Sequence, residues 1–305
     1  MDEDTGRNEE IARLAESLYG VRPRVRKLHS ENNYVCKLEF DGAVSPKVFK
    51  LAGGEHLYSS VRQEATALER LAAAGLAVPR LEHFRDDGPS APWMTLEFVT
   101  DIDLGQAIAG GMSWAEEGCR RAGAFLRDLH RAPLSLVDSF TPQHVAVTTN
   151  VSWEHWSLVQ AWDSADGETR EALIAVAACL NEQLQEPPVT VVHDSFVANH
   201  VLMDGGNAFA VNDWETIGAG YPERDLACFV GALQAWLGGL PDHRDAFLEA
   251  YREGATVWAA VERRVAAWEV YYLMNWTAFT LRHNRAEMSQ HLIQLTKKSA
   301  IAFTR

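Results

Sequence analysis

The segment between Val191 and Ala219 constrains the fold of this chain more than any other stretch of the sequence. It carries three short apolar runs typical of buried strands, at residues 189–192, 201–203 and 209–211. Gly205-Gly206 separates the last two runs and predicts a hairpin turn. Asp194, Asn199 and Asp213 stand next to these runs, so we expect the three polar side chains to lie at strand ends.

The three polar residues suit the transfer of a phosphoryl group. Asp194 precedes Asn199 by five residues, the spacing of kinase catalytic loops, which are followed by a metal-binding Asp on the next hairpin. We expect Asp194 to accept the proton of a substrate hydroxyl. Asn199 and Asp213 offer oxygen ligands, which Mg²⁺ prefers. Asp and Asn are also common in turns and helix caps, so this spacing is weak on its own.

A lysine and a glutamate upstream strengthen this interpretation. Lys50 lies in the apolar run 47–51, an expected strand, and Glu64 lies in an expected helix over residues 60–74. Kinases use a strand Lys paired with a helix Glu to hold the α- and β-phosphates of the nucleotide. Either residue alone would be interpreted as a solvated surface side chain. The matching roles occur in the expected order along the chain.

With these residues in place, the sequence resembles the aminoglycoside phosphotransferase and choline kinase-like family of small-molecule kinases. The resemblance covers nearly the whole chain and includes these segments: Lys50, Arg62 to Glu64, Gly75 to Pro79, Leu96 to Phe98, Leu126 to His130, Asp194 to Asn199, Asp213 to Glu215, and Gly220 to Ala227. It implies a protein kinase-like α+β fold with two lobes. A small antiparallel-sheet lobe is expected over residues 1–98, and a larger, mostly helical lobe over 99–305.

The catalytic loop departs from the family pattern. Where the family usually has His-Gly-Asp, this chain has Val192-His193-Asp194. Matching His193 to the family histidine would place Ser195 at the base position and His200 at the Asn position. Matching Asp194 keeps the five-residue step to Asn199, and we adopt it. Tyr221 also replaces a common Asp, whereas Asp225 is similar to the structural Asp of the family.

The resemblance also implies a set of nucleotide-binding residues. Besides Lys50 and Glu64, they are Ser30 and Asn33 in the turn 30–33, and Glu97 and Val99 where the interlobe hinge is expected. This turn lacks a Gly-x-Gly-x-x-Gly motif, and an ordinary hairpin turn explains it equally well. Glu215 is either a support for the metal site or an additional metal ligand.

Candidate substrate residues fall in two places. Asp101 and Asp103 follow the expected hinge and are candidates for contacts with ribose or acceptor hydroxyls. In the helical part, Tyr272, Asn275 and Trp276 fall at i, i+3 and i+4, so they share one helix face that with Glu269 would form a pocket wall. An ordinary amphipathic helix would show the same arrangement. The expected helices there span residues 114–131, 168–185, 225–236, 243–254, 256–282 and 287–303, after a first helix from about Glu9.

Charge and cysteine usage narrow the class of protein further. The net charge of −14 divides into −3 over residues 1–100 and −11 over the rest. Such acidity favours a cationic acceptor and disfavours nucleic acid, although it also serves solubility alone. The sequence shows neither a transmembrane-length apolar run nor an export signal, which predicts a soluble, cytoplasmic protein without a membrane partner. The four scattered cysteines are expected to be buried or partly buried thiols rather than zinc ligands.

Together these features predict the transfer of the γ-phosphoryl group of ATP or GTP to a hydroxyl of a small molecule. We favour an antibiotic-type acceptor, either an aminoglycoside or another amino-sugar or nucleoside natural product, whose inactivation would give resistance. A primary-metabolite kinase acting on choline, homoserine or a thiosugar is the alternative. A nucleotide-binding pseudoenzyme is a third hypothesis, because the catalytic loop is irregular. The sequence does not determine the oligomeric state.

Overall fold

The computed structural model describes residues 3–28, 30, 32–42, 44–88, 90–140, 166–187, 189–238, 240–253 and 259–305. The chain forms two compact units. The first comprises Met1–Asp101 and Leu202–Glu215, and the second comprises Ile102–Val201 and Thr216–Arg305. These units differ from the sequence-based lobes at residues 99–101 and 202–215.

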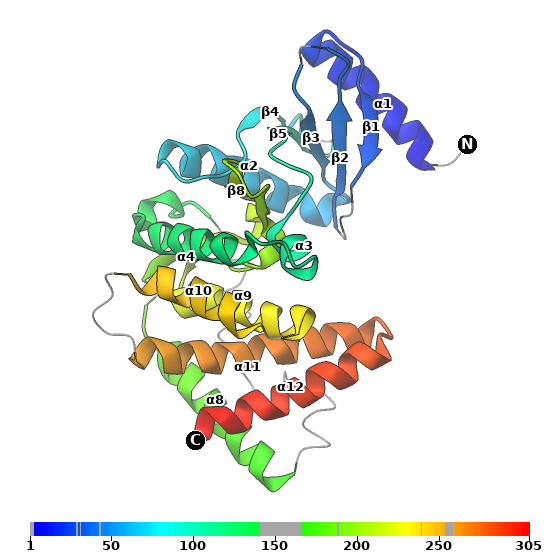
Figure 1. Ribbon diagram of the computed structural model, residues 1–305. Helices are drawn as coiled ribbons and strands as arrows, with labels where there is room; N and C mark the ends of the chain where they lie inside the picture. Colours follow the sequence, from blue (N-terminus) through cyan, green and yellow to red (C-terminus); the bar gives the residue numbers. More distant parts are fainter. Residues whose placement is uncertain are drawn as a thin grey trace. The chain divides into compact units, whose positions relative to one another are not determined.

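A five-stranded antiparallel sheet in the order β1-β2-β3-β5-β4 forms the centre of the first unit (Figure 1). Its strands are β1 (Arg24–Lys27), β2 (Tyr34–Glu39), β3 (Lys47–Leu51), β4 (Leu81–Arg85) and β5 (Trp93–Glu97). Helix α1 (Glu3–Tyr19) packs Ile11 against Phe49 and the apolar residues of β2. Because successive side chains of a strand point to opposite faces, Lys50 faces away from that core. On that side it meets Glu64 of helix α2 (Tyr58–Ala73).

Helix α1 begins earlier than predicted. Its first described residue is Glu3, whereas the sequence analysis expected a frayed segment up to about Glu9. A helix needs only one apolar face, and Ile11, Ala12 and Ala15 provide it. The polar residues of the first turns are therefore compatible with helix.

The predicted hairpin is confirmed as strands β7 (Val201–Met203) and β8 (Phe209–Val211). Gly205 adopts a φ of 79°, a backbone conformation that favours glycine. The Val211 N–H donates to the Ala77 carbonyl at 2.9 Å, which fastens the hairpin to the segment after α2. Asp213 follows directly.

The second unit is mostly helical, as predicted. Its described helices are α3 (Leu104–Ala109), α4 (Ala115–Arg131), α8 (Gly167–Gln183), α9 (Pro222–Leu237), α10 (Pro241–Arg252), α11 (Ala259–Arg282) and α12 (Ala286–Thr304). Helix α10 packs on α4, while α11 packs against both α9 and α12 (Figure 1). Residues 256–258 of one expected helix lie outside the described residues. Helix α3 was not predicted, and α9 starts at Pro222, a residue suited to the first helical position.

A short two-stranded sheet in the second unit leads to the candidate catalytic loop. Strand β6 (Thr190–Val192) pairs antiparallel with β9 (Gly218–Gly220). A Cβ at Gly220 would lie 2.7 Å from the Val192 side chain, so glycine allows this close approach. The pairing fixes the strand from which His193 and Asp194 continue.

The cysteines agree with the sequence analysis. Cys36, Cys119 and Cys228 are buried and Cys179 is partly buried, all as free thiols. Among the helices described, none combines the length and the apolar character needed to cross a membrane.

Candidate functional site

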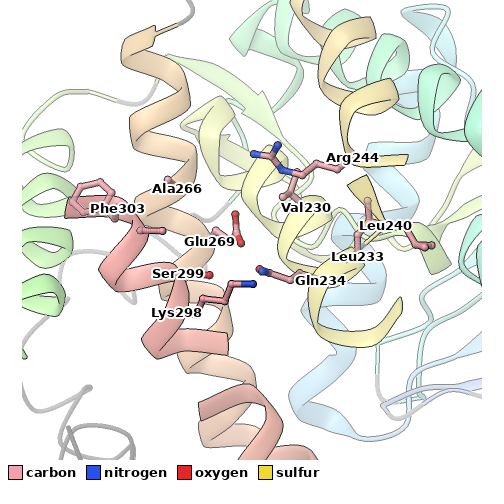
Figure 2. A pocket seen from close by; sticks show the side chains of 11 residues that line it. Val230, Leu233, Gln234, Leu240, Arg244, Ala266, Glu269, Lys298, Ser299 and Phe303 are labelled. Carbon is pink, nitrogen blue, oxygen red and sulfur yellow. The ribbon is translucent and has the colours of Figure 1, made fainter. Parts of the chain in front are cut away.

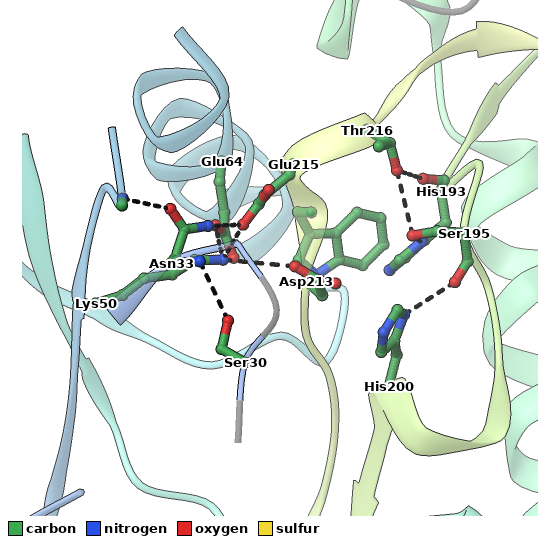
Figure 3. A network of polar contacts seen from close by, with 12 residues as sticks. Ser30, Asn33, Lys50, Glu64, His193, Ser195, His200, Asp213, Glu215 and Thr216 are labelled. Atoms are coloured by element: carbon green, nitrogen blue, oxygen red, sulfur yellow. Dashed lines mark hydrogen bonds and ion pairs between the residues drawn. The ribbon is translucent and has the colours of Figure 1, made fainter. Parts of the chain in front are cut away.

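Three carboxylates surround the ammonium group of Lys50 in the first unit (Figure 3). The Lys50 Nζ lies 2.6 Å from Glu64 Oε2, 2.5 Å from Glu215 Oε1 and 3.4 Å from Asp213 Oδ1. Lys50 and Glu64 are buried, whereas Asp213 and Glu215 are partly buried. The strand Lys and helix Glu predicted to pair are therefore in contact.

This Lys50 cluster carries more negative than positive charge. Oxygens of Glu64, Asp213 and Glu215 lie within 4.8 Å of one another, which is a suitable arrangement for holding a metal ion. Burial disfavours the charged form of Lys50, but the three carboxylates outweigh it and raise its pKa above the ordinary value. Burial raises the pKa of Glu64, and the neighbouring carboxylates add to that effect while Lys50 opposes it. One ammonium among three carboxylates leaves a site suited to a further cation.

The turn predicted to meet phosphate is joined to this cluster. The Asn33 side-chain amide donates to Glu215, and the Gly53 N–H donates to Asn33 Oδ1 at 3.3 Å (Figure 3). The Asn33 N–H in turn donates to Ser30 Oγ at 3.3 Å. A Cβ at Gly53 would lie 2.0 Å from the Asn32 carbonyl oxygen, so the two segments approach each other closely. The hydrogen bonds of Asn33 therefore hold this turn in place, and the turn contains no glycine-rich motif.

The residues at the expected hinge make mainly structural contacts. Glu97 accepts from the Arg80 N–H at 3.0 Å, and Val99 lies partly buried just beyond β5. Asp101 accepts from Arg26 and Lys37, each at 2.7 Å. Asp101 is therefore already paired with two cations.

Asp194 occupies a strained backbone position in the second unit. Its φ is 66°, in the left-handed region that non-glycine residues rarely adopt. The backbone N–H groups of His193 and Asp194 both donate to the Asp225 carboxylate at 2.8 Å. Asp213 and Asn284 are the other non-glycine residues with positive φ in the described part of the chain. Two of these three were candidate site residues, and backbone strain of this kind concentrates at functional sites.

The Asp194 carboxylate forms an ion pair with Arg224, one of the buried residues in the first turn of α9. Arg224 is itself buried and lies over the Trp268 ring at 5.2 Å. Burial raises the pKa of Asp194 to about 7, although the Arg224 charge works in the opposite direction. This Asp194 cluster, made of Asp194, Arg224 and Asp225, balances most of its charge internally.

Asp225 receives support from a residue that the sequence analysis did not assign. His130 Nε2 lies 3.1 Å from Asp225 Oδ2, and His130 Nδ1 lies 2.8 Å from the Tyr251 hydroxyl. Burial opposes ionisation of Asp225, but His130, His193 and the backbone N–H of His193 together outweigh it and lower the pKa of Asp225. The position of His130 at the end of α4 was visible in the sequence, but its long-range partner was not.

The two histidines of the candidate catalytic loop form hydrogen bonds within the loop. His193 is buried, with its Nδ1 3.2 Å from Ser195 Oγ, and His200 Nδ1 lies 2.9 Å from the Ser195 carbonyl oxygen (Figure 3). The Thr216 hydroxyl donates to the His193 carbonyl at 2.8 Å. The loop is thus held by its own polar groups where the family histidine is missing.

Asn199 contacts the start of α3. Its side-chain amide donates to Asp103 Oδ1 at 3.2 Å, and Asp103 also caps α3 in a reciprocal bond with Gln106. A Cβ at Gly105 would lie 2.8 Å from the Asn199 side chain. Asn199 and Asp213 belong to different units.

Two of the residues expected to share one face of α11, Tyr272 and Trp276, have neighbouring rings. Tyr272 adjoins Asp194 and Arg224, and its ring centre lies 5.8 Å from that of Trp276. Trp276 lies 5.9 Å from Trp236 of α9, which is exposed. We call Tyr272, Trp276 and Trp236 the aromatic face. Asn275 is partly buried on the same helix, while Glu269 lines a separate cavity (Figure 2).

Two contributors to the clusters were not among the assigned site residues. Arg224 stood inside the segment that resembles the family, but a single arginine in a helix gives no indication of a buried partner. Glu215 was considered without a definite role, and its contact with Lys50 depends on the fold. Both needed the tertiary structure to be recognised.

Comparison with solved structures shows the fold. The ternary complex of aminoglycoside phosphotransferase APH(4)-Ia with ADP and hygromycin B aligns with a TM-score of 0.66 and 14% identity, covering 96% of this chain and 98% of that chain. Spectinomycin phosphotransferase APH(9)-Ia with ADP and spectinomycin gives 0.65 and 14%, over 97% and 98%. A choline/ethanolamine kinase family protein from Mesorhizobium loti gives 0.63 and 18%, over 97% and 98%.

The predicted kinase-like fold, a small antiparallel sheet with a mostly helical remainder, is therefore confirmed. No curated protein matches the sequence significantly. The sequence model of the phosphotransferase enzyme family matches residues 24–268, which include both charged clusters. This chain belongs to the phosphotransferase enzyme family and is a small-molecule phosphotransferase.

Proposed function

We propose that this protein transfers the γ-phosphoryl group of ATP or GTP to a hydroxyl of a small molecule in a Mg²⁺-dependent reaction. The Lys50 cluster is the observation that carries this proposal. Three carboxylates around one ammonium offer more oxygen ligands than Lys50 can satisfy. Oxygen donors suit Mg²⁺, which when bound with the nucleotide would offset negative charge on the phosphate oxygens.

Each residue of the cluster, and Asn199 of the second unit, has a distinct role in the proposed reaction. Lys50 donates to the α- and β-phosphates, and Glu64 orients it through their 2.6 Å contact. Asp213 is an anionic ligand of the metal, and Asn199 is a neutral one. Glu215 links the cluster to Asn33, so the turn at Ser30 presents its backbone to the nucleotide.

Asp194 is proposed as the group that orients the acceptor hydroxyl and receives its proton. A base is most effective when its pKa lies near the working pH, and burial places the pKa of Asp194 at about 7. Arg224 and Asp225 hold its carboxylate and its backbone in place. In this step the hydroxyl oxygen forms a bond to the γ-phosphorus, and the bond from that phosphorus to the nucleoside diphosphate breaks. The diphosphate leaves, and the hydroxyl proton passes to Asp194.

Solved structures of related proteins support a nucleotide co-substrate. APH(4)-Ia was solved with ADP and with AMP-PNP, and APH(9)-Ia with ADP. We propose that Glu97 and Val99 contribute contacts to the base at the end of β5. The free thiols fit a reducing compartment such as the cytoplasm.

For the acceptor we favour an antibiotic-type molecule with an amino group. Hygromycin B and spectinomycin accompany the nucleotide in two of the similar structures. The aromatic face next to Asp194 offers ring surfaces for a sugar, a base or an ammonium group. The same face favours choline as a second candidate, because a quaternary ammonium binds well to aromatic rings. The similarity to a choline/ethanolamine kinase family protein points the same way.

A panel assay tests the function. The purified protein is incubated with Mg²⁺ and ATP or GTP against aminoglycosides, spectinomycin, nucleoside antibiotics, choline, homoserine and thiosugars. Product masses and acceptor-dependent nucleotide hydrolysis are measured. We expect one acceptor class to gain a single phosphoryl group. Nucleotide binding without transfer to any acceptor would instead support the pseudoenzyme, and loss of nucleotide binding as well would contradict the proposal.

A further inference from the structure

A cavity of about 320 Å³ lies among helices α9, α10, α11 and α12 of the second unit (Figure 2). Its walls are largely apolar, with Val230 and Leu233 from α9, Leu240 before α10, and Phe303 from α12. Neither Asp194 nor Lys50 lines it. Its volume falls at the small end of the range for ligand pockets in proteins.

Glu269 is the acidic residue among the side chains that line this cavity. In Figure 2 its carboxylate points into the cavity between Ser299 and Gln234. Within the described residues, no lysine or arginine nitrogen forms an ion pair with it; the charge of Arg244 and a hydrogen bond from the Ser299 hydroxyl favour its ionised form. Burial nevertheless raises its pKa. A carboxylate in such surroundings is costly unless a donor or a cation compensates it.

The other polar side chains of the lining do not form an ion pair with the Glu269 carboxylate among the described residues. The Gln234 side-chain oxygen is buried without a hydrogen-bond partner among the described residues. Arg244 also lines the cavity, but its guanidinium pairs with Asp245 at 3.4 Å and, among the described residues, forms no ion pair with Glu269. Lys298 is exposed at the rim of the cavity. The cavity thus combines a buried carboxylate without an ion pair, an amide oxygen without a hydrogen-bond partner among the described residues, and an apolar wall.

We propose that this cavity binds an organic primary amine with an apolar body. The ammonium group pairs with Glu269, and the hydrocarbon or aromatic part packs against Val230, Leu233 and Phe303. The apolar wall disfavours a polyhydroxylated amino sugar in this place. A Cβ added at Gly231 would meet Trp276 at 3.4 Å and Glu269 at 3.5 Å, so the cavity adjoins the aromatic face. The site stands independently of the phosphotransfer proposed above.

The test uses three matched probes and the full-length protein without nucleotide. The probes are 2-phenylethylammonium, its neutral analogue 2-phenylethanol, and the anion 3-phenylpropanoate, each titrated by calorimetry. We expect the ammonium compound to bind at least about 10-fold more tightly than the alcohol, the difference expected of a charge-assisted contact. Equal binding of the amine and the alcohol, tighter binding of the anion, or no binding of the amine would overturn the proposal.

Variants locate the binding in this cavity. Glu269→Gln should weaken the amine about 10-fold while leaving the alcohol unchanged. Ala266→Leu, which fills the cavity from α11, should abolish binding of both. Glu287→Gln on the exposed surface of α12 is the matched control and should have no effect. Lys298→Met should leave the amine unchanged or strengthen it, because Lys298 competes for the same carboxylate. Full amine affinity in Glu269→Gln, or its loss in Lys298→Met, would contradict the assignment.

Discussion

The two charged clusters of this protein meet the cost of burying charge in different ways. The Lys50 cluster gathers three carboxylates around one cation, whereas the Asp194 cluster pairs its carboxylates with Arg224, backbone N–H groups and His130. Among the described residues, the first cluster therefore has more carboxylates than cationic partners. In the second cluster, the carboxylates already have partners within the protein.

This difference follows from the tasks we propose for them. A site for a metal-bound nucleotide must leave carboxylate oxygens available for the ion, so full internal pairing would prevent binding. A base for a hydroxyl must instead be held in one orientation with a controlled pKa. The distribution of countercharge therefore separates a binding site from a proton-accepting group.

Substitution of Asp194 should have the largest effect on activity. We expect Asp194→Asn to lower turnover by about 1,000-fold, because loss of a general base typically costs two to four orders of magnitude. The nucleotide KM should change little, since the Lys50 cluster is untouched. Steady-state kinetics with the acceptor found in the panel measure both constants. Unchanged turnover would mean that the match of Asp194 to the family's catalytic Asp is wrong.

Removal of the cation from the first cluster should reduce both stability and nucleotide binding. Lys50→Met leaves Glu64 buried beside two other carboxylates, and breaking a buried pair costs about 3 kcal/mol or more. Lys47→Met is the matched control, because Lys47 lies on the same strand and pairs with Glu82 at 2.8 Å. Urea unfolding should show destabilisation of both variants. Only Lys50→Met should also lose nucleotide binding, and equal loss in both would argue for a purely structural role of Lys50.

The raised pKa of Asp194 predicts how stability depends on pH. Burial raises that pKa from 3.8 to about 7, so the native chain holds the proton more tightly than the unfolded chain. The resulting stabilisation is fully present below pH 3.8 and is lost as the pH rises through about 7. Asp194→Asn removes this group. As the pH rises from 3.8 to about 7, the unfolding free energy of the wild type should therefore fall relative to that of the variant. A pH-independent difference would show that the pKa of Asp194 is not raised.

The smallest effect is expected at Gly105. A Cβ there would lie 2.8 Å from Asn199, so Gly105→Ala should displace that side chain. We expect turnover to fall by about 10-fold, because small misplacements of ligands to the reacting groups are costly. Gly6→Ala, where nothing lies within 4 Å of an added Cβ, controls for the change of glycine to alanine. Unaltered Mg²⁺ dependence and turnover in Gly105→Ala would argue against Asn199 as a ligand.

The sequence predicted the strand and helix around Lys50 and Glu64 because local patterns determine both elements. The apolar run at residues 47–51 predicted β3, and the alternation of Ala, Leu and charged residues predicted α2. The hairpin at Gly205 was predicted by its turn residues. The kinase-like fold followed from the order of these elements and the resemblance to the family.

The sequence did not predict contacts that join residues far apart in the chain. Arg224 reaches Asp194, and His130 reaches Asp225, only after α4 and α9 have packed. Helix α3 was missed because its capping box at Asp103 was interpreted as a substrate contact, although the spacing to Gln106 is a helix-start pattern. The assignments of Asp101, Asp103 and Asn275 as substrate residues remain predictions.

Calorimetric titration of Mg²⁺ and ATP into wild type, Asp213→Asn and Asp194→Asn, combined with the transfer assay, tests the division of roles most directly. We predict that Asp213→Asn loses Mg²⁺-dependent nucleotide binding. Asp194→Asn should bind the nucleotide as wild type does and yet fail to transfer the phosphoryl group. The account is contradicted if Asp213→Asn retains Mg²⁺-dependent binding, or if Asp194→Asn retains transfer.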